Sequence, residues 1–266
     1  MHPIERLRYV ARAEEDRPTL LVREAAGAIA GFSDDPSGLL TACRRLVDRH
    51  WVLAPMWWLA ARVLCSLNPY EEAWDAADEL EADDTAKVLL ELLPEEGAVL
   101  MIGWPEIVGT AVRRAGALTP YVVDGGGQWA AAIHRMERNG IDLIDVPEAG
   151  IGSAIDVCNL VLLEASALGP DGFVAPSASR AAAAVAHAAG VPVWVAAGVG
   201  RVLPGRLWEA LAGRFHADPE PWFADDELVS LDLVDAVVGP KGKQSVADAV
   251  RRADCPIPPE LLKGPM

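Results

Sequence analysis

The 266-residue sequence has few cysteines and few basic residues, and both shortages exclude classes of protein. Its four cysteines form no Cys-x-x-Cys pair, so zinc and dithiol redox motifs are absent and we expect no metal site. Lysine and arginine number 23 against 39 acidic residues, which gives a formal net charge of −16. Because nucleic acids and anionic lipids are bound through clustered cations, this charge argues against both partners.

Long apolar segments that could cross a membrane are also scarce. The stretch 181–200 has the required length and contains no Asp, Glu, Lys or Arg. Gly190-Val191-Pro192 divides it, however, which predicts a helix, a turn and a buried parallel strand. The N-terminus mixes charged and apolar residues and lacks the pattern of a signal peptide. We therefore expect a cytoplasmic protein whose four cysteines are reduced core residues.

What is present is a foldable composition, with 52% hydrophobic and 23% charged residues. Up to residue 93 apolar residues recur at helical spacing, interrupted by proline and aspartate clusters that end and begin helices, which predicts about five helices. From residue 94 short apolar runs alternate with helical stretches. The predicted fold class is α/β: an N-terminal helical domain, residues 1–93, followed by a Rossmann-like, mostly parallel doubly wound sheet, residues 94–266.

The second part divides into candidate strands and helices. Strands are expected at 98–102, 120–123, 141–146, 160–163, 191–196 and 234–238. Helices are expected near 106–115, 129–138, 151–157 and 180–189, and residues 214–227 are interpreted as an acidic surface loop or lid. Since ligands bind beyond the carboxyl ends of parallel strands, functional residues are sought in the loops that follow those strands.

One such loop, Asp124-Gly125-Gly126-Gly127, leads from a strand into a helix. Gly125, Gly127 and residue 130 match the spacing of a dinucleotide fingerprint, and residue 145 lies where a ribose-binding carboxylate is wanted. Adjacent glycines are equally typical of a plain turn, and Asp124 opposes a pyrophosphate. An NAD-dependent oxidoreductase is therefore a weak alternative, and no cofactor is predicted.

Two further loops carry polar residues. The strand at 160–163 is followed by Glu164 and Ser166, and a turn then leads to Ser177, Ser179 and Arg180 at a helix start, where hydroxyls and free N–H groups favour an anion or simply cap the helix.

A second glycine loop presents Arg201 after the strand at 191–196, either to an anion or to solvent. Lys241 and Lys243 are candidates for the same anion pocket or plain surface lysines.

Other conspicuous residues have structural interpretations. Trp51, Trp57 and Trp58 lie at helical spacing, which is typical of core or interface anchors. The acidic run from 71 to 84 is interpreted as a solvated helix face.

Several segments resemble the translation initiation factor 2B alpha/beta/delta subunit family, whose superfamily includes methylthioribose-1-phosphate and ribose-1,5-bisphosphate isomerases. The resemblance rests on segments 150–156, 159–180 and 190–196, with Gly103 after the first strand and Asp-Gly-Phe-Val-Ala at 171–175. It is close over about residues 98–197 and extends in outline over most of the chain. It implies a helical domain, a Rossmann-like sheet and assembly through the C-terminal domain.

The resemblance also indicates that isomerase chemistry has been lost. The Gly-Ala-Asp segment that supplies a catalytic carboxylate reads Glu164-Ala165-Ser166 here. A hydroxyl does not move protons as a carboxylate does. The family's catalytic cysteine has no counterpart, because no cysteine lies between positions 65 and 158.

The phosphate-binding positions depart as well. The family's Asn-Lys pair falls on Pro176 and Ser177, its Gly-Thr pair on Ser179 and Arg180, and an expected arginine is replaced by Gly126. We therefore predict a divergent protein that lacks isomerase turnover. It is expected to be a non-catalytic oligomeric scaffold or a sensor of a phosphorylated small molecule, with a homodimer as the assembly. The alternative is a sugar-phosphate or nucleotide-phosphate isomerase that uses Glu164, or Asp171 or Asp124, in place of the missing aspartate.

Overall fold

The computed structural model describes residues 5, 10, 18–127, 129–138, 140–251 and 253–262. Its N-terminal part is helical, as predicted. The helices there are α2 (Pro18–Ile29), α3 (Pro36–Arg49), α4 (Ala54–Cys65), α5 (Pro69–Glu81) and α6 (Thr85–Leu92), with the 3-10 turn η1 (Ala30–Phe32) after α2. The predicted helix starts are confirmed by caps: Asp35 accepts from the N–H of Gly38 and Asn68 from that of Glu71, each followed by a proline that suits the first turn.

Helix α4 is the centre of the helical module. Nine of its 12 residues are buried, including Trp57 and Trp58. The indole N–H of Trp57 donates to the carbonyl of Trp51 at 2.9 Å, and that of Trp58 donates to the carbonyl of Asp254 at 2.8 Å. The interpretation of these two tryptophans as core anchors is therefore confirmed, and Trp58 also ties the helical module to the C-terminal segment.

The main sheet has seven strands in the order β10-β9-β7-β4-β1-β2-β3. All neighbours are parallel except β10, which runs antiparallel to β9. The strands are β1 (Gly97–Ile102), β2 (Leu118–Val123), β3 (Ile144–Val146), β4 (Leu160–Glu164), β7 (Val193–Ala196), β9 (Ala236–Gly239) and β10 (Gly242–Gln244). The predicted fold class is confirmed, and the segment 181–200 is helix, turn and strand as expected.

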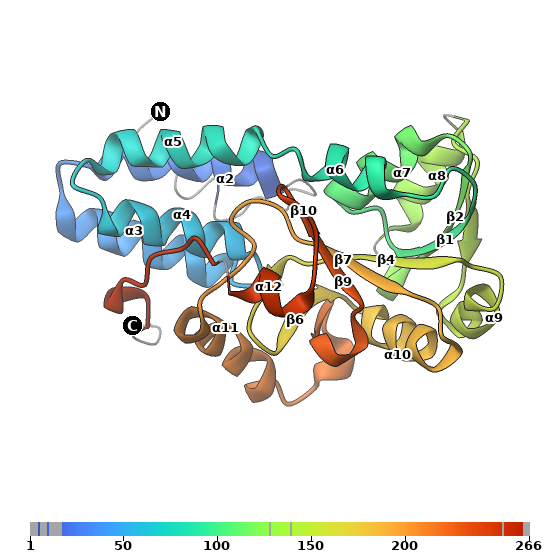
Figure 1. Cartoon of the computed structure of the whole chain (residues 1–266). Coiled ribbons are helices and arrows are strands. Elements are labelled where there is room, and N and C mark those ends of the chain that lie inside the picture. The colour runs from blue at the N-terminus through green and yellow to red at the C-terminus, as the bar shows by residue number, and fades with distance from the viewer. Residues whose placement is uncertain are drawn as a thin grey trace.

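Helices cover both faces of this sheet (Figure 1). One face is packed by α6, α7 (Glu106–Ala115) and α8 (Ala130–Arg138), the other by α9 (Ile151–Ile155), α10 (Ser179–Ala189) and α12 (Val246–Val250). Leu89 of α6 belongs to the core on the first face, so α6 packs on the sheet although it precedes residue 94. The division of the chain at residues 93 and 94 stays a prediction.

A second, antiparallel sheet was not predicted. It has the order β5-β6-β8, with β5 (Ala167–Leu168), β6 (Gly172–Pro176) and β8 (Asp226–Ser230). The expected loop at 214–227 is wrong in extent: it begins inside α11 (Gly205–Ala217) and ends in β8. The remaining 3-10 turns are η2 (Gly125–Gly127), η3 (Glu148–Gly150), η4 (Pro221–Phe223), η5 (Leu231–Leu233) and η6 (Pro259–Leu262).

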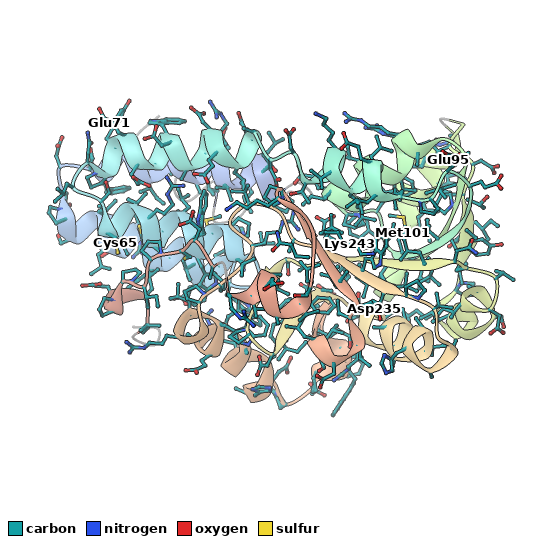
Figure 2. All side chains as sticks on the ribbon, viewed as in Figure 1. Cys65, Glu71, Glu95, Met101, Asp235 and Lys243 are labelled. Carbon is teal, nitrogen blue, oxygen red and sulfur yellow. The ribbon has the colours of Figure 1, made fainter. Side chains whose placement is uncertain are left out.

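The cysteines follow the prediction in three positions of four. Cys43, Cys158 and Cys255 are buried and free, whereas Cys65 at the end of α4 is exposed, so its assignment to the core is wrong (Figure 2). Among the described helices, none is both long and apolar enough to cross a membrane.

Candidate functional site

The topology places the site where β1 and β4 meet. From β1 the chain moves outward to β2 and β3, and from β4 it moves the other way to β7 and β9. A crevice beyond the carboxyl ends of two such strands is the usual ligand position of an open parallel sheet. Here β4 ends at Glu164, and the loop after β1 leads into the N-terminus of α7.

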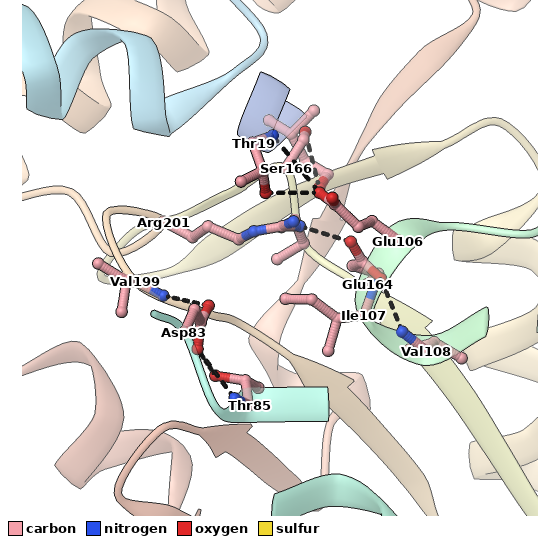
Figure 3. A network of polar contacts seen from close by, with 12 residues as sticks. Thr19, Asp83, Thr85, Glu106, Ile107, Val108, Glu164, Ser166, Val199 and Arg201 are labelled. Atoms are coloured by element: carbon pink, nitrogen blue, oxygen red, sulfur yellow. Dashed lines mark hydrogen bonds and ion pairs between the residues drawn. The ribbon is translucent and has the colours of Figure 1, made fainter. Parts of the chain in front are cut away.

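Glu164 is immobilised in that crevice. Its side chain is 4% exposed, and its Oε2 accepts hydrogen bonds from the backbone N–H groups of Ile107 and Val108 at 2.8 and 2.9 Å. Its Oε1 lies 2.8 Å from Nη1 of Arg201 (Figure 3). The carboxylate therefore occupies the positive N-terminal end of α7 and neutralises a buried guanidinium at the same time.

Arg201 is not the solvated turn residue that one interpretation expected. Only 5% of it is exposed, and its Nη1 also donates to the carbonyl of Ala165 at 2.8 Å. Its backbone carbonyl accepts from the N–H of Leu168. Its anionic partner in the structure is a carboxylate of the same chain, and its role in binding a ligand stays a prediction.

Asp83, between α5 and α6 of the helical module, contacts the loop that follows β7. Its Oδ2 accepts the N–H of Val199 at 2.9 Å, and its Oδ1 accepts the N–H and hydroxyl of Thr85. A Cβ at residue 198 would lie 2.0 Å from Asp83 Oδ2, so this approach requires glycine there. The interpretation of the acidic run 71–84 as solvated is wrong for Asp83.

A cavity of about 200 Å³ opens beside this network. Arg201 lines it together with the three acidic residues Glu81, Asp83 and Glu106, and Thr19 donates its hydroxyl to Glu106 Oε2 at 2.9 Å. Three carboxylates against one guanidinium that is already paired make an unfavourable environment for a phosphate.

Ser166, the residue at the missing aspartate position, has a structural role. Its hydroxyl donates to the carbonyl of Val174 at 3.3 Å, and its own carbonyl accepts the N–H of Ala54 at the start of α4. It therefore joins the second sheet to the helical module.

The glycine loop after β2 is tightly packed. Asp124 accepts the N–H of Trp129 at 2.7 Å, and a Cβ on Gly103 would lie 2.4 Å from the Trp129 indole. A Cβ on Gly125 would lie 2.1 Å from the carbonyl oxygen of Ser177. Gly125, Gly126 and Gly127 form η2. Gly125, the turn position of the fingerprint, is covered by Ser177, whereas a Cβ on Gly127, the position that a pyrophosphate would approach, would meet nothing within 4 Å.

The start of α10 is likewise engaged. Ser177 donates its N–H to the carbonyl of Asp225 and its hydroxyl to that of Ala224. The N–H of Arg180 donates to Oε1 of Glu227 at 2.9 Å, and its Nε lies 3.4 Å from Oε2. The carboxylate of Glu227 therefore stands at this helix N-terminus, where an external anion was expected.

Two polar atoms near these loops have no partner among the described residues: the hydroxyl of Ser179, which is fully buried, and the indole N–H of Trp129. Ala178, just before Ser179, has a left-handed φ of 79°. No cluster of His, Cys, Asp or Glu in the described part of the chain could hold a metal ion.

The predicted residues thus form connected groups rather than one open pocket. Glu164 contacts Arg201 directly, Gly125 packs on Ser177, and Arg180 turns to Glu227. The sequence prediction missed Asp83, Glu106, Glu227 and Trp129. Only Asp83 carries a local signal, since an aspartate two residues before Thr85 is typical of a helix start.

Comparison with known proteins agrees with this architecture. Translation initiation factor eIF-2B from Pyrococcus horikoshii OT3 superposes with a TM-score of 0.77 at 13% identity, covering 93% of this chain and 98% of that one. The chain matched in the tetrameric eIF2B-beta2-delta2 complex from C. thermophilum gives 0.72 at 18% identity, covering 94% and 92%. The 5-methylthioribose 1-phosphate isomerase from P. horikoshii OT3 gives 0.67 at 13% identity, covering 94% and 86%.

No protein-family model matches the sequence, and no curated protein sequence matches it. The structural comparisons show the fold of a helical domain joined to a Rossmann-like sheet. More particularly, it is the fold that initiation factor 2B subunits share with 5-methylthioribose 1-phosphate isomerase, and the resemblance noted in the sequence is confirmed at this level.

Proposed function

We propose that this protein is a non-catalytic, oligomeric scaffold built on the fold of the initiation factor 2B subunits and the related isomerase. The observation that carries the proposal is the state of Glu164. A general base must reach a substrate proton, but both oxygens of this buried carboxylate are held by Arg201 and by two amides of α7. If the Glu164 carboxylate moved away, the buried guanidinium of Arg201 would be left without its partner.

The loss of the other reactive groups supports the same conclusion. The family's cysteine has no counterpart between positions 65 and 158. Ser166 stands where the resemblance places the aspartate, and its hydroxyl is engaged with the carbonyl of Val174. The two other candidate acids are engaged as well, Asp124 with the N–H of Trp129 and Asp171 with the indole N–H of Trp208.

The N-termini of α7 and α10 argue against a phosphate sensor of the usual kind. A carboxylate of the chain occupies each of these two positions, Glu164 at α7 and Glu227 at α10. An incoming phosphate would have to displace a like charge from each position. The sensor is retained as a second candidate on one observation, the buried and unpartnered hydroxyl of Ser179 at the start of α10.

The oligomeric part of the proposal rests on an exposed aromatic pair. Trp222 and Phe223 on η4 are 71% and 76% exposed and lie edge to face, with ring centroids 6.3 Å apart. Adjacent aromatic side chains left in water are typical of interface anchors. A similar chain forms part of a complex described as tetrameric.

Light scattering combined with thermal unfolding tests the proposal. We expect a dimer or larger assembly at micromolar concentration, and an unfolding temperature that ribose 5-phosphate and 5-methylthioribose 1-phosphate leave unchanged. A ligand at a hundred times its dissociation constant would add about 2.7 kcal/mol to the free energy of unfolding. A monomer would contradict the scaffold, and a stabilisation lost in Ser179→Ala would favour the sensor.

A further inference from the structure

A second cavity, of about 150 Å³, lies at the carboxyl ends of β7 and β9, away from Glu164. The loop 197–200 and the hairpin 239–244 form two of its sides, and Trp58 of α4 forms a third. It therefore lies between the sheet and the helical module, and nothing in the proposed scaffold role uses it.

The apolar walls of this cavity are fixed in place. Trp58 is 2% exposed, and its indole N–H is held by the carbonyl of Asp254. The guanidinium of Arg62 lies 4.6 Å from the ring centroid of Trp58, and a Cβ on Gly200 would lie 3.0 Å from the same ring. Val202 and Val237 continue the apolar lining. Such a pre-formed apolar space is suited to a small hydrocarbon group.

The rim of the cavity carries charges of both signs. Glu79, Lys241 and Asp254 line it, and Glu79 is paired with Arg62 through Oε2 and Nη1 at 2.5 Å. Lys241 and Asp254 are exposed at the rim and form no ion pair with the described residues, so one ammonium and one carboxylate are available to a ligand. A ligand with an anionic and a cationic end would satisfy both, whereas a simple anion or cation would face one like charge.

We propose that this cavity binds a small zwitterion with an apolar body, an α-amino acid with a branched aliphatic side chain. Its carboxylate pairs with Lys241 and its ammonium with Asp254, while the side chain enters the space beside Trp58. The size agrees, because a cavity of about 150 Å³ holds a group of about six carbon atoms.

Isothermal titration with L-leucine tests the proposal. Saturable binding is expected, and 4-methylpentanoate, which lacks the ammonium, and 3-methylbutylamine, which lacks the carboxylate, are each expected to bind at least about tenfold more weakly. Absence of saturable binding of L-leucine up to about 10 mM would overturn the proposal. Equal affinity for L-leucine and either analogue would overturn it as well.

Two lysines of one hairpin provide a matched pair of variants. Lys241→Gln and Asp254→Asn are expected to weaken L-leucine binding by about tenfold each. Lys243→Gln is the control, because the Lys243 ammonium lies 3.6 Å from the ring centroid of Trp194 and Lys243 is not among the residues that line the cavity. An equal loss in Lys241→Gln and Lys243→Gln would place the ligand elsewhere and overturn the assignment. Turnover and oligomer size, which test the scaffold, are independent of these results.

Discussion

At the scale of single residues, the proposed loss of isomerase chemistry rests on the buried pair of Glu164 and Arg201. Both side chains are almost fully buried, and their two charges neutralise each other across 2.8 Å. Such a pair is costly to break on one side, because the remaining charge is left without a partner in the interior. We therefore infer that the ion pair of Glu164 and Arg201 stabilises the fold and has no catalytic role.

Removing the charge of Glu164 tests this interpretation. Glu164→Gln is expected to lower the free energy of unfolding by about 3 kcal/mol, since Arg201 then stays buried and unpaired. Urea denaturation measures the loss. Asp78→Asn serves as the control. Asp78 pairs with Arg23 at the surface, where such a pair contributes less than about 1 kcal/mol to the free energy of unfolding. A Glu164→Gln loss no larger than that of the control would contradict the structural role.

A second residue gives a pH dependence. Burial, together with the neighbouring Asp225 carboxylate, raises the pKa of Asp226 from 3.8 to about 6. Between these values the folded chain holds a proton that the unfolded chain has released, so the free energy of unfolding falls as the pH rises from about 4 to 6.

We expect Asp226→Asn to remove this fall and to stabilise the protein at pH 7 by about 1 to 2 kcal/mol. Unfolding curves at several pH values measure it, with exposed Asp142→Asn as the control. An unchanged slope in Asp226→Asn would contradict the assignment.

At the scale of elements, the start of α10 combines a strained residue with a blocked helix end. Ala178 holds a φ of 79°, which is unfavourable for a residue with a Cβ. The backbone reaches this conformation between β6, which is paired with β8, and a helix in whose first turn the N–H of Arg180 donates to Glu227.

Replacing Ala178 by glycine should therefore stabilise the protein. Ala178→Gly is expected to raise the free energy of unfolding by about 1 kcal/mol, because glycine adopts the left-handed region without strain. The same change in the middle of α10, Ala184→Gly, is expected to cost about 1 kcal/mol. Thermal unfolding of both variants checks the opposite signs, and destabilisation in both would contradict the strain.

The elements themselves were predictable to an uneven degree. The strand at 98–102 and the helix at 106–115 were predicted almost to the residue, because each has one clear hydrophobic period and clear flanking residues. The antiparallel sheet was missed, because β5 has two residues and β8 lies in an acidic segment without an alternating pattern.

The site was less predictable than the fold for a physical reason. Glu164 and Arg201 were both identified as polar residues at strand ends, but their pairing depends on two strands that are distant in sequence. Asp83 reaches a loop 116 positions away, and its local pattern indicates only a helix start at Thr85, not this distant contact.

At the scale of the whole molecule, the account predicts assembly through the aromatic pair on η4. The double variant Trp222→Ser and Phe223→Ser is expected to be monomeric at micromolar concentration, because two large apolar anchors are lost from the interface. Leu67→Ser is the control, since Leu67 is fully exposed on the helical module, between α4 and α5. Sedimentation velocity separates the outcomes: an unchanged assembly in the double variant would place the interface elsewhere.

In the proposed function, the chain's own charged groups occupy the crevice between β1 and β4, and isomerase chemistry does not take place there. Proton NMR of 5-methylthioribose 1-phosphate incubated with the purified protein tests it most directly. We predict no conversion to the ketose above the rate without protein. Conversion that is abolished in Glu164→Gln, while the fold of that variant is retained, would contradict the account.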